Sequence, residues 1–376
     1  MSPRILISAG EASGDAHAAR LVAALRPLLP DAEFFGVGGA ALRAAGCETV
    51  VDARDVCVLG LVEVVAHLPR IYREFHRLLA EADRRRPDAA ILVDFPDFNF
   101  RLARQLHARG IPVFYYISPQ LWAWRAGRVK LVRRYIRKML VIFPFEEQFY
   151  RARGVDAVYA GHPLADAAAP PVDHAAFAAR HGLDPAKPWI ALLPGSRRRE
   201  VGLNLPEMLA AAARFGDECQ FILPVASTLD RAEIAAAVAS ARPGGIILTD
   251  DARLALAHAR AGIIASGTAT LEAALIGTPF VMVYRVAPLT YALGRHLVRV
   301  PHFGIVNLIL GRSVVPEFVQ SDFTASRVEA EIRRLLADGP ARRGQLAAFA
   351  ELCARLAEGS GLPAAERAAR LIVQSL

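Results

Sequence analysis

The segment RILISAGEASGDAHAA, residues 4–19, decides the fold that we expect for this chain. An apolar run ends at a glycine, a short loop follows, and an alanine-rich helical segment begins. Continuous apolar strands that alternate with helices indicate a parallel sheet covered on both faces. The loop is a poor phosphate cradle, however, because Glu11 and Asp15 would repel an anion.

The same strand-and-helix unit recurs in two blocks. In the first block we expect strands at 4–10, 33–39, 89–95, 112–118, 139–144 and 157–161, and in the second at 188–194, 219–225, 245–250, 261–267 and 279–285. The stretch 161–174 contains three prolines and no apolar periodicity, so it is the best linker candidate. After about residue 325 the sequence is helical to its end.

These patterns predict an α/β protein with two Rossmann-like doubly wound domains facing across a cleft and a helical C-terminal tail. The expected boundaries are 1–165, 166–340 and 341–376, with the last helices packing back toward the N-terminal domain. Ligands of open α/β sheets bind beyond the carboxyl ends of the strands, so we expect a two-substrate site between the domains.

Composition narrows the class of protein. The chain has 376 residues, of which 54% are hydrophobic and 22% charged, which is typical of a globular protein. The net charge of +8 is explained mainly by the arginine codons of a GC-rich genome; it is compatible with acidic partners but does not choose among nucleotides, phosphorylated sugars, membranes and nucleic acid. Four scattered cysteines without a C-x-x-C pair indicate neither disulfides nor zinc. With no signal-peptide pattern and no apolar run of about 20 residues, we expect a cytoplasmic protein.

The strongest candidate site is IIASGTATLEAALIGTPF, residues 263–280. A strand is expected to end at Ser266–Gly267 and a helix to begin at Thr268 or the next residue, so the free amides of the first turn can bind an anion. Thr268 and Thr270 add hydroxyls, and Glu272 is a candidate for ribose hydroxyls. The alternative is an ordinary helix N-cap.

A second loop, LLPGSRRREV at 192–201, repeats this arrangement in the same block. Gly195 and Ser196 follow a buried strand, and Arg197 adds a guanidinium that can bind a phosphate. A surface turn with solvated arginines is the alternative. Together the two loops indicate that the second block binds a diphosphate.

In the first block, LVDFPDFNFRLA at 92–103 carries carboxylates where a strand ends. Asp94 is a candidate general base because it falls at the end of a buried strand. Asp97 and Asn99 follow in the turn, and at least one of them is expected to cap the next helix. Two carboxylates without further ligands are weak evidence for a metal.

Two segments suggest a membrane surface. A basic amphipathic helix is expected over 125–138, with Arg128, Arg134, Arg137 and Lys138 as membrane contacts; a solvated helix packed on the sheet is the alternative. The apolar stretch 58–79 is either core or a patch for acyl chains. The segment 303–320 is expected to be irregular and to line a cleft through Asn307, Glu317 and Gln320, unless the Asn is buried and satisfied by backbone groups.

The ordered motifs SAGEASGD, DFPDFNFRLA, ISPQLWAW, GHPL, LLPGSR, SGTATLEAAL, GTPFVMVYR and VPEFVQ resemble those of lipid-A-disaccharide synthases, from about residue 4 to about residue 325. Phe95 and the Gln120–Leu121 pair are local variants. The resemblance implies a GT-B glycosyltransferase that moves 2,3-diacylglucosamine from its UDP carrier to 2,3-diacylglucosamine 1-phosphate. The products would be the lipid A disaccharide 1-phosphate and UDP.

The residue patterns and the resemblance together suggest roles for the candidate residues, and no cofactor or metal is expected. Asp94 is the first choice of base, followed by Asp97 and then by Asp15 or Glu11. The acceptor residues would be Gly10, Ser13, Gly14 and Asn99. The UDP-sugar residues would be Gly195, Ser196, Arg197, Gly267, Thr268, Thr270, Glu272, Asn307, Glu317 and Gln320.

The expected partners are the two acylated sugars and the cytoplasmic surface of the inner membrane, which the enzyme would bind peripherally. No nucleic-acid partner is expected, and a homo-oligomer is left open. Two rival interpretations remain: an enzyme like UDP-N-acetylglucosamine 2-epimerase, and a non-catalytic basic protein that binds membrane surfaces.

Overall fold

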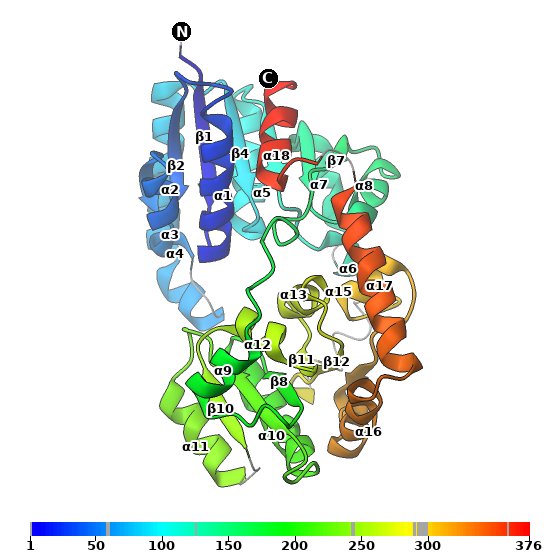
Figure 1. Ribbon diagram of the computed structural model, residues 1–376. Helices are drawn as coiled ribbons and strands as arrows, with labels where there is room; N and C mark the ends of the chain where they lie inside the picture. The colour runs from blue at the N-terminus through cyan, green and yellow to red at the C-terminus, as the bar shows by residue number, and fades with distance from the viewer. Residues whose placement is uncertain are drawn as a thin grey trace. The chain divides into compact units, whose positions relative to one another are not determined.

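The computed structural model describes residues 2–57, 61–124, 126–241, 245–288, 291, 300–358 and 361–376. The chain divides into two compact units. Unit 1 comprises residues 1–166 and 356–376, and unit 2 comprises residues 167–355. The chain therefore leaves unit 1, builds unit 2 and returns to unit 1 for its last segment (Figure 1).

Unit 1 contains a parallel sheet of seven strands in the order β3-β2-β1-β4-β5-β6-β7. The chain moves outward from β1 through β2 to β3 and then resumes on the other side of β1 with β4, so the strand order reverses between β1 and β4. The strands are β1 (Arg4–Ala9), β2 (Glu33–Gly38), β3 (Glu48–Asp52), β4 (Ala89–Val93), β5 (Val113–Tyr116), β6 (Lys138–Val141) and β7 (Ala157–Tyr159).

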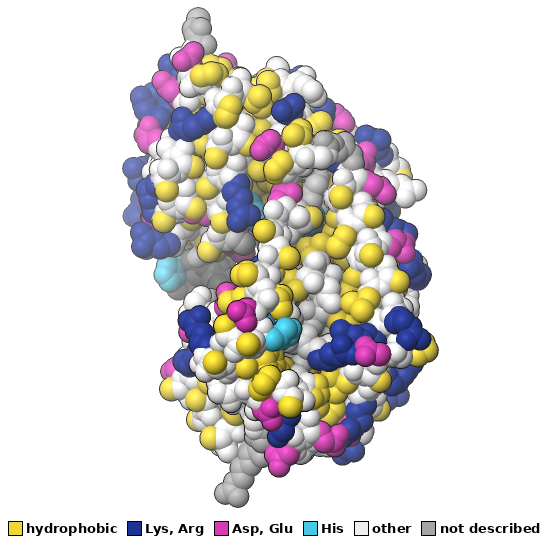
Figure 2. All heavy atoms as spheres, viewed as in Figure 1, with side chains coloured by type: hydrophobic (Ala, Val, Ile, Leu, Met, Phe, Trp, Pro, Cys, Tyr) yellow, Lys and Arg dark blue, Asp and Glu magenta, His cyan; other side chains and the backbone are white. Residues whose placement is uncertain are grey.

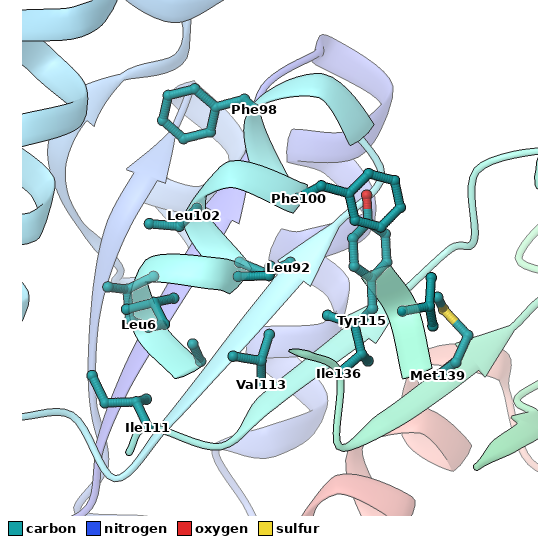
Figure 3. Close-up of a cluster of buried hydrophobic side chains, with 14 of the residues drawn as sticks. Leu6, Leu92, Phe98, Phe100, Leu102, Ile111, Val113, Tyr115, Ile136 and Met139 are labelled. Carbon is teal, nitrogen blue, oxygen red and sulfur yellow. The ribbon is translucent and has the colours of Figure 1, made fainter. Parts of the chain in front are cut away.

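Helices cover both faces of this sheet because its strands are apolar on both sides. Along β1, Leu6 belongs to one core cluster while Ile5 and Ile7 belong to the other, as the two-residue period of a strand requires. One cluster packs against α4 (Leu61–Arg85), α5 (Pro96–Ala108) and α7 (Val129–Tyr135), and Figure 3 shows part of it. The other packs against α1 (Ala12–Leu25) and α18 (Ala364–Val373), which lie side by side (Figure 1).

The remaining helices of unit 1 are short and lie in its connections. They are α2 (Ala40–Ala44), α3 (Ala53–Val56), α6 (Leu121–Trp124), the 3-10 turn η1 (Ala126–Arg128) and α8 (Pro144–Arg151).

Unit 2 contains a second parallel sheet, with six strands in the order β10-β9-β8-β11-β12-β13. Its strand order reverses between β8 and β11. The strands are β8 (Trp189–Leu193), β9 (Gln220–Pro224), β10 (Ile246–Thr249), β11 (Ala261–Ala265), β12 (Phe280–Tyr284) and β13 (Glu317–Val319).

The helices of unit 2 again lie on both sides of the sheet. One core cluster contains α10 (Arg198–Ala213), α11 (Arg231–Ala241) and α16 (Ala325–Leu336), and another contains α9 (His174–His181) and α12 (Ala252–His258). The other elements are α13 (Thr268–Ile276), α15 (Ile305–Leu310), the 3-10 turn η2 (Gln320–Asp322) and α17 (Pro340–Ala357), at whose end the chain re-enters unit 1.

The fold class predicted from sequence is confirmed, with two parallel α/β domains and a helical C-terminal region. Three local predictions need correction. The strands β3 and β13 were not expected, and the segment 303–320 is not irregular, because it forms α15 and β13. The helix expected over 125–138 ends at Tyr135, and Lys138 begins β6.

The apolar stretch 58–79 is described only in part, since residues 58–60 and the side chains of 61–66 lie outside the described residues. Among the helices that the structure describes, none combines the length and the apolar character that crossing a membrane requires.

Candidate functional site

In unit 1, the loops after β1 and β4 meet where the strand order reverses, the usual place for a ligand in such sheets. Gly10 and Glu11 follow β1, and Asp94 and Phe95 follow β4. A Cβ atom on Gly10 would collide with the ring of Phe95, so glycine is required there for the two loops to approach. Glu11 is the N-cap residue of α1, but its side chain does not cap the helix.

Asp94 has the ionisation expected of a general base that works near neutral pH. Burial has the largest effect on the pKa of this carboxyl and raises it, and the nearby negative charge of Glu11 raises it further. A hydrogen bond from the backbone amide of Phe95 opposes them, and the net effect raises the pKa of Asp94 to about 6. The group is therefore still an anion at pH 7, but it is more basic than an ordinary aspartate.

The backbone at this edge is strained. Asp94 and Phe95 have φ values of 46° and 51°, and Ile117, just beyond β5, has φ of 63°. Such left-handed conformations are costly for residues other than glycine, and a β-branched residue rarely adopts them. Strain of this kind persists only where surrounding contacts hold it, and it concentrates at functional sites.

Two buried side chains hold the strained backbone of Asp94 in place. The Tyr115 hydroxyl donates to the carbonyl of Asp94 at 2.5 Å, and the Asn99 amide donates to the same oxygen at 2.7 Å. Asn99 also accepts from the Ser8 hydroxyl at 2.7 Å, which ties the end of β1 to the end of β4. The ring of Tyr115 lies beside that of Phe100 in the hydrophobic core (Figure 3).

The structure separates the other acidic candidates of unit 1 by their surroundings. Asp97 lies in the first turn of α5, not in a turn before it, and forms an exposed ion pair with Arg128 at 2.8 Å. Asn99 lies in the same helix and caps nothing, because the N-cap residue of α5 is Phe95. Asn99 is fully buried, so its amide supports the loops and is not offered to a ligand.

The Asp15 side chain has a structural role. Its carboxylate accepts the backbone amides of Gly39 at 2.6 Å, Ala41 at 2.9 Å and Leu42 at 3.3 Å, and so binds the start of α2 to α1. The remaining acceptor candidates differ in exposure: Ser13 is exposed and Gly14 is buried.

A further network in unit 1 was missed by sequence reasoning. Glu146 is fully buried at the start of α8, where its carboxyl accepts from the Trp122 indole at 3.0 Å and from the Phe143 amide at 3.1 Å. Burial raises the pKa of Glu146 to about 8. The pattern Phe-Pro-Phe-Glu, a proline at the first helical position with a glutamate two residues later, is the signal that could have identified it.

In unit 2, the two loops predicted to bind a diphosphate follow β8 and β11. These strands are adjacent, and the strand order reverses between them. Helix α13 begins at Thr268 as predicted, and Gly267 and Thr268 are exposed. A Cβ atom on Gly267 would meet nothing within 4 Å, so the backbone there lies in open space.

The loop after β8 turns sharply at Gly195, whose φ of 119° and close approach to Glu200 both require glycine. Ser196 and Arg197 are exposed, and Arg197 is the N-cap residue of α10. The Ser196 amide points to the Glu200 carboxylate at 3.3 Å, and the Thr228 hydroxyl donates to the Ser196 carbonyl at 2.6 Å.

Asn204 supports this loop from the core and was also missed from the sequence. It is fully buried, and its amide donates to the Pro194 carbonyl at 3.2 Å while its oxygen accepts the Arg285 amide at 3.0 Å. It therefore joins the loop after β8 to the end of β12. Its only signal in the sequence is a polar residue within the buried face of a helix.

Two residues of the loop after β11 differ from expectation. Thr270 is buried, and its hydroxyl donates to the Gly267 carbonyl at 2.7 Å, so it stabilises the start of α13. Glu272 lies in the second turn of α13, not the first, 3.8 Å from Arg253. Burial is the largest influence on Glu272, and it raises the pKa of that carboxyl.

The three polar residues expected to line a cleft instead form internal contacts. Glu317 accepts the amides of Phe303 at 2.8 Å and Gly304 at 3.0 Å, and the Asn307 amide at 2.7 Å. Asn307 is fully buried and also bonds the backbone of residues 314–315, as its alternative interpretation anticipated. Gln320 bonds the amide and the carbonyl of Val286.

The four basic residues predicted to contact a membrane do not share one helix. Arg128 ends η1, Arg134 lies in α7, Arg137 follows α7, and Lys138 begins β6. Lys138 donates to the Ser375 hydroxyl at 2.8 Å. Figure 2 shows lysines and arginines spread over the face in view, without one dominant patch.

Comparison with known proteins adds to this geometry. Residues 5–359 match the model of a protein family described as lipid-A-disaccharide synthetase. A lipid-A-disaccharide synthase from Koribacter versatilis is 57% identical over 373 residues, which cover 98% of each chain.

Among solved structures, the calicheamicin glycosyltransferase CalG4 is similar with a TM-score of 0.60, at 18% identity, over 99% of this chain and 98% of that one. A UDP-N-acetylglucosamine 2-epimerase is similar with a TM-score of 0.61, at 12% identity, over 99% of this chain and 95% of that one. These two likenesses place the chain in the GT-B fold but do not separate a transferase from an epimerase. The sequence match makes that distinction.

Proposed function

The chain belongs to the lipid-A-disaccharide synthase family of glycosyltransferases, and on that premise we propose that it transfers 2,3-diacylglucosamine from UDP to 2,3-diacylglucosamine 1-phosphate. The products are the β-1′,6-linked disaccharide 1-phosphate and UDP. The reaction is a single inverting displacement, in which the acceptor 6-hydroxyl attacks the anomeric carbon as the bond to UDP breaks.

Asp94 is the general base that removes the proton of the acceptor hydroxyl. The observation that carries this assignment is a carboxylate whose pKa is raised to about 6, held in a strained conformation where the strand order reverses. A base of this strength is ionised at neutral pH and is a better proton acceptor than an ordinary aspartate. Glu11 lies nearby and contributes to the raised pKa, so it assists without accepting the proton itself.

Unit 2 binds the UDP carrier through the loops after β8 and β11. The N-termini of α10 and α13, which begin beside exposed residues, stabilise together with the guanidinium of Arg197 the negative charge that develops on the departing UDP. Glu272, one turn into α13, is the candidate for the ribose hydroxyls. This division places the base on one unit and the leaving group on the other.

Both substrates carry acyl chains, so the enzyme binds the cytoplasmic surface of the inner membrane peripherally through unit 1. Supporting this, Leu68 and Tyr72 on α4 are 45% and 67% exposed, and Trp124 at the end of α6 and Leu131 in α7 are 48% and 37% exposed. Reversing the charges of Arg134 and Arg137 should weaken binding to anionic liposomes in a salt-dependent manner. Unchanged binding would contradict a role for these two residues.

One assay tests the proposed reaction directly. The protein is incubated with UDP-2,3-diacylglucosamine, with or without 2,3-diacylglucosamine 1-phosphate, and the products are identified by mass spectrometry. We expect disaccharide and UDP only when the acceptor is present. Interconversion of UDP-sugars without acceptor would favour the epimerase, and binding to liposomes without turnover would favour the non-catalytic protein.

A further inference from the structure

A groove of about 800 Å³ lies between α10 and α11 in unit 2 and has no role in the reaction as described so far. Figure 1 shows the two helices next to each other. The lining runs along α10 from Arg198 to Leu209, which corresponds to about 16 Å of helix. Its volume falls within the range of small-molecule sites.

The groove exists because small residues line both walls. Gly202 on α10 lies opposite α11, whose wall includes Ala237, Ser240 and Ala241. A Cβ atom on Gly202 would meet nothing within 4 Å, which confirms open space at this position. The floor is formed by larger apolar side chains that are buried in the core, namely Val201, Leu205, Leu209 and Ile234.

The charged side chains of the lining gather at one end. Arg198, Thr228, Asp230 and Glu233 surround the mouth, at the N-terminal ends of the two helices. Arg198 and Glu233 form an ion pair across it at 2.6 Å, with side chains 82% and 50% exposed. An ion pair this exposed contributes little to stability and can open for a ligand.

The mouth is continuous with the loop after β8. Thr228 lines the groove, and its hydroxyl donates to the carbonyl of Ser196 in that loop. Three consecutive exposed arginines, residues 197–199, border the same end. The order along the surface is therefore a cationic loop, a polar mouth and an apolar floor, which complements an amphiphile with an anionic head and a hydrocarbon chain.

We propose that this groove binds one fatty acyl chain of the nucleotide-linked sugar donor. The diphosphate lies at residues 195–197, the chain passes the Arg198–Glu233 pair, and its methylenes bury against Val201, Leu205 and Leu209. The inference rests on the proposed function, because it takes the donor's anionic head to lie at the loop after β8.

The test fills the groove without touching the loop. Gly202→Leu and Ala237→Leu place a branched side chain in the cavity from opposite walls. Ala210→Leu and Ala236→Leu add the same side chain to the same helices at exposed positions outside the lining. Leucine is a good helix former, so all four variants should fold.

Calorimetry measures the affinity of each protein for three ligands: UDP, a UDP-diacylglucosamine with butyryl chains and one with myristoyl chains. We expect both groove variants to bind the myristoyl donor roughly tenfold more weakly, because each methylene denied burial weakens binding about fourfold. Affinity for UDP and for the butyryl donor should be unchanged, and the two control variants should match the wild type.

Several results would overturn the proposal. If the groove variants lost equal affinity for UDP and for both donors, the leucines would be disturbing the loop after β8. If they bound the myristoyl donor with wild-type affinity, the groove would not be the site of the acyl chain. A change in oligomeric state with unchanged donor affinity would assign the groove to a second copy of the chain. Binding needs no turnover, so a failure of the proposed transferase reaction, measured separately as disaccharide formation, is distinguishable from a failure of this inference.

Discussion

At the scale of single residues, the raised pKa of Asp94 fixes how activity should depend on pH. The base works only when ionised, so kcat/KM should fall as the pH drops below about 6. Asp94→Asn should lower kcat by about 10²–10⁴-fold with little change in UDP affinity. Asp97→Asn, which removes the charge of an exposed ion pair with Arg128, should retain activity. The opposite ranking of the two variants would move the base to Asp97.

Glu11 provides a second test of the same carboxyl. Its negative charge raises the pKa of Asp94, so Glu11→Gln should move the acid limb of the pH profile to lower pH. The expected change is in the position of the limb, measured as kcat/KM against pH. A limb that stays in place would show that Glu11 does not act on the titrating group.

Tyr115 acts through the backbone of Asp94, and its hydroxyl can be removed without changing its ring. In Tyr115→Phe, the carbonyl of Asp94 keeps only the hydrogen bond from the Asn99 amide. The variant should lower kcat by about tenfold, because a small displacement of a catalytic group slows the reaction strongly. KM should change little, and the free energy of unfolding should fall by about 1 kcal/mol.

Tyr159→Phe is the matched control. It removes another buried hydroxyl, which donates to the Leu356 carbonyl at 2.8 Å, away from Asp94. It should cost similar stability while kcat is preserved. Equal kcat values for Tyr115→Phe and Tyr159→Phe would contradict the proposal that Tyr115 positions Asp94.

At the scale of elements, Glu146 joins the start of α8 to α6 through Trp122. The pKa of this carboxyl is about 8 in the folded protein and about 4.5 when it is free, so between these values the unfolded chain releases a proton that the folded chain keeps. Stability should therefore fall as the pH rises from about 4.5 to about 8. Glu146→Gln should flatten that slope, as measured by denaturant unfolding across the range. An identical slope in both proteins would contradict the buried neutral acid.

The elements also show what the sequence could and could not predict. The central strands were found because each is a continuous apolar run. The strand β3 (ETVVD) lies at the sheet edge with polar ends, and β13 (EFV) has three partly exposed residues, so neither carries that signal. The sequence predicts a helix over 125–138 that is too long, because basic and apolar residues continue from α7 into β6 without a glycine or proline.

For the candidate site, as for the strands and helices, the sequence predicts some features and not others. Asp94 is predicted as the base because a carboxylate directly follows a buried strand. Tyr115 is not predicted, because its hydroxyl reaches a carbonyl 21 residues away that only the sheet brings near. Asp15 is a candidate base and Asn307 a candidate UDP-sugar residue in the sequence, with a buried Asn307 as the alternative, whereas in the structure the side-chain oxygens of both accept hydrogen bonds from backbone amides elsewhere in the chain. Local patterns predict strand ends, but they do not show which polar side chains form hydrogen bonds within the protein.

At the scale of the whole molecule, unit 1 is completed by the end of the chain. Ala368, Ala369 and Ile372 of α18 are fully buried in the cluster that α1 covers, so the first and last helices share one core. Ile372→Ala should lower the free energy of unfolding by about 2–5 kcal/mol, because it leaves a cavity there. Leu376→Ala, at a position 44% exposed, should change it by less than about 0.5 kcal/mol.

The two units should respond differently to this change, because Ile372 contributes to the core of unit 1 alone. UDP affinity, which we assign to unit 2, should be preserved in Ile372→Ala at temperatures where disaccharide formation is already lost. Calorimetric titration with UDP and a parallel activity assay over a temperature series would measure both. If UDP binding and activity were lost together, the folding of unit 2 would depend on α18, and the division of the chain into a base-bearing unit and a separately folded UDP-binding unit would be wrong.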